Sequence, residues 1–178
     1  WLASTQPFHW IAEFYQIIHE NKGFDVIIGN PPYVEYTRRN VPYNIVGYET
    51  IKSANLYSFV FERSFQIGKK KIAFIVQLSS VGNVGMGSLQ KFLLNNSKQM
   101  YYGCFPERPQ QLFDGACIAL SIILCEKGKY NQCNRYGAGI YRTAKEYRPY
   151  LFHNIHNQSI AIDSYFLPDL TLFPKYNN

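Results

Sequence analysis

Residues Phe24 to Tyr33 read F-D-V-I-I-G-N-P-P-Y, and this stretch indicates the fold class. Its β-branched run at positions 26–28 is typical of a strand that is covered on both faces. Gly29 lets the backbone leave that strand without a side chain in the way. We therefore expect Asn30 at the carboxyl end of a strand, which is where open α/β sheets place their ligands.

The segment after this strand is predicted to be rigid. The residue before a proline avoids the helical conformation and each proline fixes its own φ, so residues 30–32 should be extended and stiff. An aromatic amine needs acceptors that hold its two hydrogens while its lone pair is redirected. The side-chain oxygen of Asn30 and the carbonyl of Pro31 can be those acceptors, and Tyr33 can stack on the ring. The alternative is a Pro-Pro turn that only closes a core strand, with Asn30 satisfying its local backbone.

Helical and strand patterns alternate along the rest of the chain. We expect helices over residues 10–20, 56–67 and 89–95, and further buried strands over residues 72–77, 100–105 and 117–125. Residues 34–53 show no steady period and should form a loop over the site. Strands separated by helices favour an α/β fold with a parallel sheet, and the last two strands could close one edge as an antiparallel pair.

The N-P-P-Y turn after a hydrophobic strand resembles the catalytic motif of amino-group-specific DNA methyltransferases, in particular the adenine-specific ones. The surrounding segments resemble the catalytic domain of large single-chain restriction-modification enzymes over about residues 7 to 127. These segments are residues 7–10, 13–14 and 23–25 before the turn, and residues 55–59, 72–76, 79–80, 87–93 and 112–125 after it.

The resemblance implies the C-terminal half of a Rossmann-like, S-adenosylmethionine-dependent methyltransferase sheet. It implies transfer of a methyl group from S-adenosylmethionine to the exocyclic amine of adenine in DNA, within a restriction-modification system. Asn30, Pro31 and Tyr33 would hold the flipped adenine, and Pro32 would keep the turn rigid. Phe113 would contact the same base from another side.

The chain departs from the family pattern in the segment that precedes Asn30. No acidic residue followed by a G-x-G turn occurs there, so the cofactor-binding residues are not identified. We therefore expect an incomplete catalytic piece that is inactive alone and binds S-adenosylmethionine weakly. Residues 82–87 are glycine-rich, but they resemble a mobile loop of the family more than a phosphate cradle.

The resemblance implies double-stranded DNA as a partner, and the charge distribution is compatible with it. The formal net charge is +6, and the segment from Lys127 to Arg148 holds six cations against Glu146 alone, with tyrosines between them. Such a segment can contact phosphates and bases, although a solvated basic surface has the same composition. We divide the chain into residues 1–127, a partial catalytic domain, and residues 128–178, a basic tail that could begin a target-recognition region. Arg38 and Arg39 follow the turn closely and are placed to meet a DNA backbone or to lie in an ordinary polar loop.

The remaining patterns favour a cytoplasmic protein without a metal site. Its four cysteines include no C-x-x-C pair, and no apolar run approaches a membrane span or forms a signal peptide. Two alternative functions stay open. One is methylation of a glutamine amide in a protein, since that related class also carries N-P-P-Y, and the other is a non-catalytic DNA-binding fragment.

Overall fold

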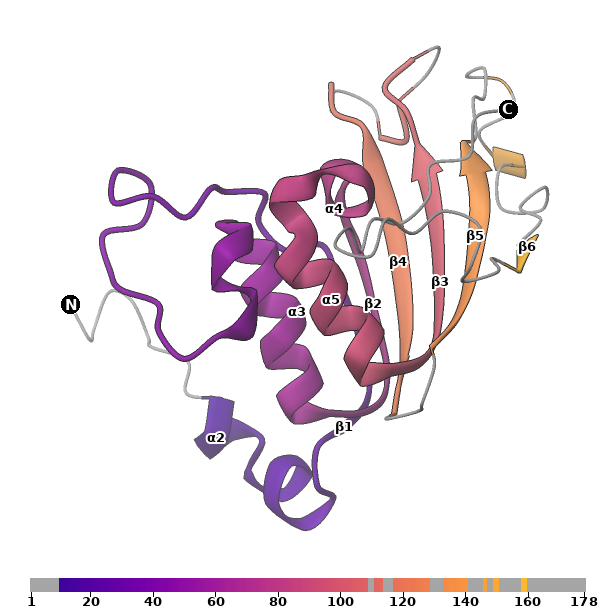
Figure 1. Ribbon diagram of the computed structural model, residues 1–178. Coiled ribbons are helices and arrows are strands. Elements are labelled where there is room, and N and C mark those ends of the chain that lie inside the picture. The colour runs from indigo at the N-terminus through magenta and orange to yellow at the C-terminus, as the bar shows by residue number, and fades with distance from the viewer. Residues whose placement is uncertain are drawn as a thin grey trace.

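A mixed sheet with the strand order β1-β2-β4-β3-β5-β6 forms the centre of the molecule (Figure 1). The computed structural model describes residues 10–108, 111–113, 117–128, 133–140, 146, 149–150 and 158–159. The strands are β1 Phe24–Gly29, β2 Gly68–Gln77, β3 Ser97–Phe105, β4 Leu120–Lys127, β5 Asn134–Ile140 and β6 Gln158–Ser159.

The pairing of the strands agrees with the predicted sheet in two respects and differs in one. β1 pairs with β2 in parallel, and β3 pairs with β4 antiparallel, as expected. The prediction that β3 and β4 close an edge is wrong, because β4 lies between β2 and β3, and β3 also pairs in parallel with β5. β5 was not predicted, and it continues the sheet beyond the expected domain boundary at residues 127/128.

The helices pack on one face of this sheet (Figure 1). α3 Leu56–Ile67 and α5 Gly87–Asn96 are the long ones, and both lie close to their predicted ranges. α3 begins where the Asn55 side chain accepts a hydrogen bond from the Tyr57 backbone N–H, a typical N-cap. The short elements are α2 Trp10–Glu13, the π-helix η1 Gln16–Glu20, the 3₁₀ helices η2 Glu49–Ser53 and η3 Val84–Met86, and α4 Ser79–Gly82.

The N-terminal segment differs from the single helix that the sequence pattern predicts. α2 and η1 are separated, and Tyr15, expected on the apolar face, is 54% exposed and stacks on His19. The segment ends at Lys22 and Gly23, which have φ values of 61° and 116°. A Cβ on Gly23 would lie 2.2 Å from the Ile67 carbonyl oxygen, so glycine is required for the chain to enter β1 beside α3.

The hydrophobic core lies between the helices and one face of the sheet. α3 and α5 contribute aromatic and leucine side chains, and the central strands contribute alternate residues, because successive strand side chains point to opposite faces. The largest fully buried apolar side chains of this core are Tyr57, Phe61, Ile72, Val76, Leu89, Leu93, Met100 and Ile123.

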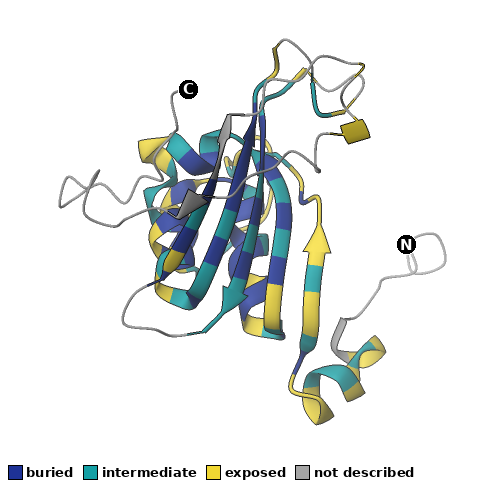
Figure 2. Ribbon diagram, turned by 90° about the vertical axis from the view of Figure 1, so that its right-hand side faces the viewer, coloured by how far each residue is buried: buried dark blue, intermediate teal, exposed yellow. Residues whose placement is uncertain are grey.

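The opposite side of β1 is exposed, so the prediction of a strand covered on both faces is wrong. Val26 and Ile28 are 56% and 75% exposed, whereas Ile27 between them packs against the core. Figure 2 shows β1 as a largely exposed strand at one edge of the sheet. The physical reason is that β1 pairs only with β2 among the described strands, while the helices cover the other face.

Glycine followed by lysines at positions 69–71 is a pattern typical of a helix end, and it predicts that these lysines close α3. They instead lie in β2. α3 stops at Gly68, where the backbone turns extended and β2 begins. Lys69 and Lys70 place their Nζ atoms 3.4 and 3.1 Å from Asp25 Oδ1. A hydrogen bond from Lys70, helped by the charge of Lys69, lowers the pKa of the Asp25 carboxyl. The start of β1 is therefore tied electrostatically to β2.

The described residues contain neither a membrane-spanning helix nor a metal-binding cluster. No helix there is long and apolar enough to cross a membrane. No group of three or more His, Cys, Asp or Glu side chains in the same ranges is arranged to hold a metal ion. Of the four cysteines, Cys104, Cys125 and Cys133 are buried, and Cys117, predicted inside a strand, is exposed ahead of β4.

Candidate active site

The turn that follows β1 is attached to the neighbouring strand through Tyr33. Asn30 and Pro32 are exposed, Pro31 is buried, and Tyr33 is half-buried. The Tyr33 hydroxyl contacts Asn30 Oδ1 and lies 3.1 Å from the carbonyl oxygen of Ile75 in β2. Burial raises the pKa of Tyr33 above its ordinary value, so the hydroxyl stays protonated at neutral pH and can donate. Asn30 is thus held at the carboxyl end of β1, as predicted.

The hydrogen-bond capacity of this group indicates how the Asn30 amide is used. A tyrosine hydroxyl has one hydrogen, and here it meets two carbonyl-type oxygens. If the Asn30 amide is rotated by about 180°, its NH2 donates to the Tyr33 hydroxyl, which in turn donates to the Ile75 carbonyl. The Tyr33 hydroxyl then both accepts and donates one hydrogen bond, and Asn30 Oδ1 is left as a free acceptor. Even without this rotation the oxygen keeps a second acceptor position.

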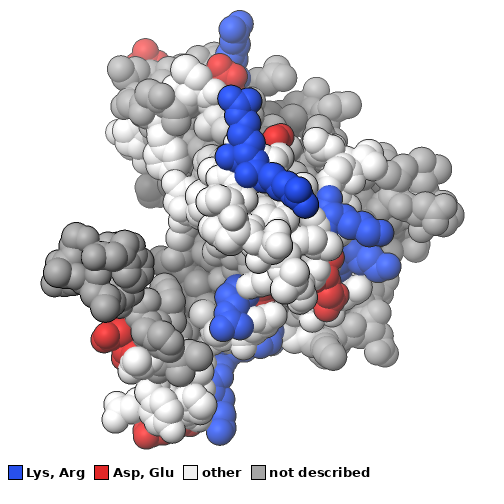
Figure 3. Space-filling view, turned by 90° about the vertical axis from the view of Figure 1, so that its left-hand side faces the viewer, with Lys and Arg blue, Asp and Glu red and all other residues white. Residues whose placement is uncertain are grey.

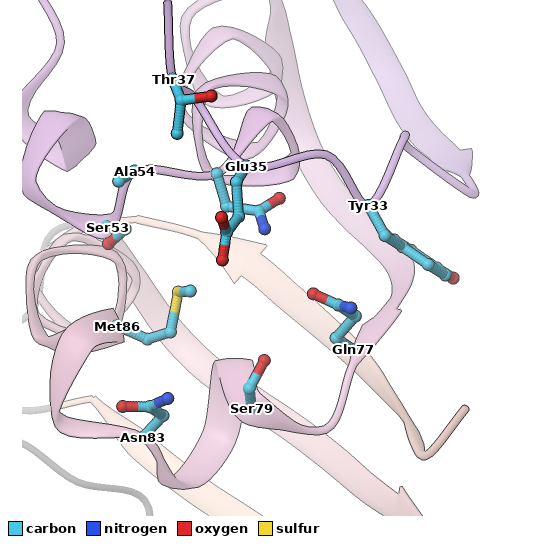
Figure 4. A pocket seen from close by; sticks show the side chains of 10 residues that line it. Tyr33, Glu35, Thr37, Ser53, Ala54, Gln77, Ser79, Asn83 and Met86 are labelled. Atoms are coloured by element: carbon cyan, nitrogen blue, oxygen red, sulfur yellow. The ribbon is translucent and has the colours of Figure 1, made fainter. Parts of the chain in front are cut away.

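A pocket of about 380 Å³ borders Tyr33, whereas Asn30, Pro31 and Pro32 do not line it. That volume falls within the range typical of small-ligand sites. The lining residues come from the turn after β1, from the end of η2 and the start of α3, and from the segment after β2, and they are Tyr33, Glu35, Thr37, Ser53, Ala54, Asn55, Gln77, Ser79, Asn83 and Met86. In Figure 4 the Tyr33 ring lies at one side of the pocket, and the side chains of Glu35, Gln77 and Met86 point toward its interior.

The polar groups of the pocket divide into two kinds. Asn55 and Asn83 use their side-chain oxygens to cap the segments that follow them, accepting from Tyr57 N at 3.4 Å and from Gly85 N at 2.9 Å. Gln77 and Glu35 have no side-chain hydrogen bond within the described ranges of the chain. An uncommitted amide and an uncommitted carboxylate are therefore available to a ligand in this pocket.

Sequence reasoning missed Gln77, Glu35 and Ser79 as pocket residues. Gln77 is the last residue of β2, which is parallel to β1, so Gln77 and Asn30 come at the same edge of the sheet. The carboxyl ends of neighbouring parallel strands are where such sheets bind ligands, and that rule could have identified Gln77. Behind the pocket wall the buried Tyr57 hydroxyl donates to Met86 Sδ at 3.3 Å, and burial raises the pKa of Tyr57, an effect that Ser79 partly offsets.

The other predicted site residues are not brought together with the turn. Phe113 is 42% exposed and does not line the pocket. Arg38 and Arg39 are exposed on residues 34–53, the segment predicted as a loop over the site. Residues 82–87, predicted as a mobile loop, contain the end of α4, the helix η3 and the first residue of α5. Most of the basic stretch after Lys127, and residues 7–9 of the resemblance, lie outside the described residues.

The acidic residue of β1 is not placed to bind a nucleoside cofactor at the carboxyl edge of the sheet. The acidic residue of β1, Asp25, sits at the start of the strand, at the opposite end from Asn30. Its carboxylate is paired with Lys69 and Lys70 and is not directed toward the pocket edge of the sheet.

Comparison with known proteins places these observations in a family. Residues 2–108 match the Eco57I restriction-modification methylase family. The chain is also 30% identical over 125 residues to a Methanocaldococcus jannaschii protein assigned as a type II restriction enzyme and methyltransferase. That match covers 68% of this chain and 10% of the relative, so the chain spans about a tenth of the length of the curated protein that it resembles.

Two solved structures share the fold. One is a nuclease-deletion mutant of the Type ISP restriction-modification enzyme LlaGI in complex with a DNA substrate mimic. The match has a TM-score of 0.62 and 17% sequence identity, and it covers 86% of this chain and 19% of the LlaGI chain. The other is the DrdV–DNA complex, with a TM-score of 0.60 and 16% identity over 78% of this chain and 17% of that one. The predicted α/β fold, part of a Rossmann-like methyltransferase sheet, is thereby confirmed.

Proposed function

Because the chain belongs to the Eco57I restriction-modification methylase family, we propose that it carries the base-binding half of a DNA methyltransferase that modifies the exocyclic amine of adenine. The observation that carries this proposal is the exposed Asn30 amide, attached through Tyr33 to β2 beside a pocket at the carboxyl edge of the sheet. The proposed activity belongs to the whole protein, of which this chain supplies the residues described below.

Asn30 and Pro31 supply the acceptors that an aromatic amine needs. The amine's lone pair is delocalised into its ring, and hydrogen bonds from its two N–H groups to Asn30 Oδ1 and the Pro31 carbonyl oxygen localise it on nitrogen. These acceptors lie on a proline-stiffened turn, so they are oriented before the substrate arrives and act as fixed dipoles. No side chain has to remove a proton first.

The pocket supports a flat, polar ligand. The base must leave the helix stack to bring its amine to Asn30, and an extruded base needs a cavity with groups that bond its edge. Gln77 offers both a donor and acceptors, and Glu35 offers acceptors, which suits the mixed edge of a purine. Tyr33 is available as a ring surface, although its hydroxyl is bonded to the turn and to β2.

The methyl donor in this proposal is S-adenosylmethionine, which carries its methyl group on a positively charged sulfur. Its binding is expected to need segments beyond the described ones, since no acidic residue followed by a G-x-G turn precedes Asn30 and Asp25 is paired with Lys69 and Lys70. We propose that this chain alone binds the cofactor weakly and is inactive.

Double-stranded DNA is the proposed partner. Two proteins of the same fold are described in complexes with DNA or a DNA mimic, and this chain has a net charge of +6. Arg38, Arg39 and Phe113 are exposed and available for DNA contacts. We also propose that residues 1–127 belong to the catalytic domain and that residues 128–178, whose strand β5 still pairs with β3 of that domain, lead into the region that recognises the target sequence.

Transfer of a labelled methyl group tests this proposal directly. The protein that carries this chain is incubated with labelled S-adenosylmethionine and with duplex DNA or a glutamine-containing protein substrate. We expect label on N6 of adenine and none on protein. Label on a glutamine amide would establish the protein-methylating alternative, and DNA binding without transfer to any substrate would establish the non-catalytic one.

A further inference from the structure

Residues 34–53 form a loop that leaves and returns at the rim of the pocket, and we call them the rim loop. Glu35 and Thr37 line the pocket at its start, and Ser53 lines it at its end. The two ends are joined by backbone hydrogen bonds from Tyr36 N to Ala54 O at 2.8 Å and from Leu56 N to Val34 O at 2.9 Å. Figure 1 shows the loop extending from the helical side of the molecule.

The inside of the rim loop is anchored to α3. Glu62, a buried residue of α3, accepts hydrogen bonds from the backbone N–H groups of Glu49 at 3.1 Å and Thr50 at 3.0 Å. The rings of Tyr36 and Tyr48 each lie 5.4 Å from Phe59. The Tyr36 hydroxyl accepts a hydrogen bond from Ile45 N at 2.7 Å. The loop therefore has a defined shape, with its backbone bonded on the side that faces α3.

Three large apolar side chains of the rim loop are exposed, and Tyr43 and Val46 are more exposed than Ile51, which is at 37%. Tyr43 is 60% exposed and Val46 is 78% exposed. The same loop carries Arg38 and Arg39, both exposed. Figure 3, which views this side of the molecule, shows lysine and arginine side chains in a row across the face, with few acidic groups between them. An anchored loop that combines apolar tips with cations matches the way proteins enter a base stack from its phosphate-lined surface.

We propose that the rim loop is a DNA wedge: Tyr43, three residues before the exposed Val46, fills the space that the extruded nucleotide leaves in the duplex. Arg38 and Arg39 hold the adjacent phosphates. This inference rests on the proposed function, because a gap arises only when a base has been moved into the pocket. The position of the loop supports it, since the segment that lines the pocket at both ends is the one that carries Tyr43.

The energetic reason is that an empty gap in a base stack is unfavourable. Unstacking one nucleotide loses its contacts with both neighbouring bases, and a tyrosine ring restores part of them. A wedge should therefore lower the cost of flipping without contacting the flipped base. It should also prefer DNA in which the gap already exists, and this preference can be measured without knowing the target sequence.

The test compares two duplexes that differ in a single nucleotide. One is intact, and the other carries a tetrahydrofuran abasic nucleotide at its centre. Fluorescence anisotropy gives the affinity of the protein that carries this chain for each duplex, and all variants are made in that protein. We expect tighter binding to the abasic duplex, and we expect Tyr43→Ala to reduce that preference about tenfold, because base–aromatic stacking accounts for it. Tyr43→Phe should retain the preference, since it keeps the ring.

Matched variants separate the wedge from general DNA binding. Tyr15→Ala removes a tyrosine of similar exposure, 54%, from the segment before η1, and it should leave the preference unchanged. The double change Arg38→Gln with Arg39→Gln should weaken binding to both duplexes equally and reduce the salt dependence by about two phosphate contacts.

Each other outcome has a definite meaning. If Tyr43→Ala behaves like Tyr15→Ala, the wedge is wrong, while DNA methylation can still be detected in the transfer assay. If Tyr43→Ala removes the abasic preference but no methyl group is transferred to adenine, the wedge stands and the proposed activity fails. If the unaltered protein binds neither duplex, or Tyr43→Ala abolishes its self-association instead, the loop does not contact DNA in this way.

Discussion

β1 and β2 are adjacent parallel strands with similar side chains and different surroundings. β1 carries Val26 and Ile28 at 56% and 75% exposure, whereas Ile72 and Val76 in β2 are fully buried. β2 has a hydrogen-bonded neighbour on each side and helices over the face that holds these residues, and β1 pairs with β2 alone in the described part of the sheet. A β-branched run therefore indicates a strand, but it does not indicate how many sides of that strand are covered.

The two strands also differ in what they contribute. β2 supplies core packing along its length, whereas the most informative part of β1 is the turn just beyond it, where Asn30 is held by Tyr33. Substitutions in β2 should consequently change stability, and substitutions at the end of β1 should change chemistry. The predictions that follow test this separation, from the largest expected effect to the smallest.

Asn30→Ala should abolish most methyl transfer and leave folding intact. The exposed amide contributes little to packing, and loss of one fixed dipole at a reacting group typically costs about 10²–10³ in rate. The measurement is transfer of labelled methyl groups to DNA by the protein that carries this chain, together with duplex affinity, which should stay the same. Asn95→Ala, at an exposed asparagine of α5, is the control. Unchanged transfer by Asn30→Ala would show that the acceptor role is wrong.

Ile72→Ala and Ile28→Ala form a matched pair on neighbouring strands. Ile72 is fully buried, so its truncation should lower the free energy of unfolding by about 2–5 kcal/mol. Ile28 is largely exposed, and the same change there should cost less than about 0.5 kcal/mol. Urea denaturation followed by circular dichroism gives both values. Equal losses would mean that the exposed face of β1 is covered in solution, and the contrast between the strands would disappear.

The reaction rates of the cysteine thiols measure how often the strands next to β2 open to solvent. Cys125 pairs across the ladder with Ile72, and burial raises its pKa to about 12. Burial also raises the pKa of Cys133 to about 11, and Cys117 is exposed. Because the thiolate is the reactive form, one thiol per chain should react quickly with a disulfide reagent near pH 8, and Cys117→Ser should remove that fast phase.

The remaining three thiols should react only when denaturant opens the sheet. Fast reaction of all three remaining thiols in the native Cys117→Ser chain would include Cys125 and would show that β4 opens readily. The packing of β2 would then be no firmer than that of β1.

The smallest effect should come from the ion pairs that join the start of β1 to β2. An aspartate carboxyl ordinarily has a pKa of 3.8. Lys70 and Lys69 lower the pKa of Asp25 in the folded chain. A lowered folded pKa contributes stability above the unfolded value, and that contribution is lost as pH falls through the folded value. The thermal midpoint of unfolding should therefore fall when the pH is lowered from neutral to strongly acidic. This fall should be slightly larger in the unaltered chain than in the Asp25→Asn variant. Added salt should shrink the difference, since the pair is exposed.

Local patterns predicted those features that depend on neighbouring residues in the chain. The strand before Asn30, the helix over residues 56–67 and the parallel pairing of β1 with β2 were predicted correctly because periodicity, β-branching and a helix cap are encoded within a few residues. β5 was missed since its two glycines and its arginine give a weak strand signal, and it forms by pairing with β3. Phe113 was expected near the turn on the strength of one aromatic residue, and it does not line the pocket.

The amino-acid sequence by itself determined a rigid, polar turn at the end of a strand, because proline geometry and the conformational preference of the residue before it are local properties. Only the tertiary structure decided which groups meet at that turn. Glu35 and Gln77 come from segments far apart in the chain, and they share a pocket because β1 and β2 end at the same edge of the sheet. Exposure of Val26 and Ile28 was likewise decided by the number of elements that pack on each strand, a quantity that no short stretch of residues contains.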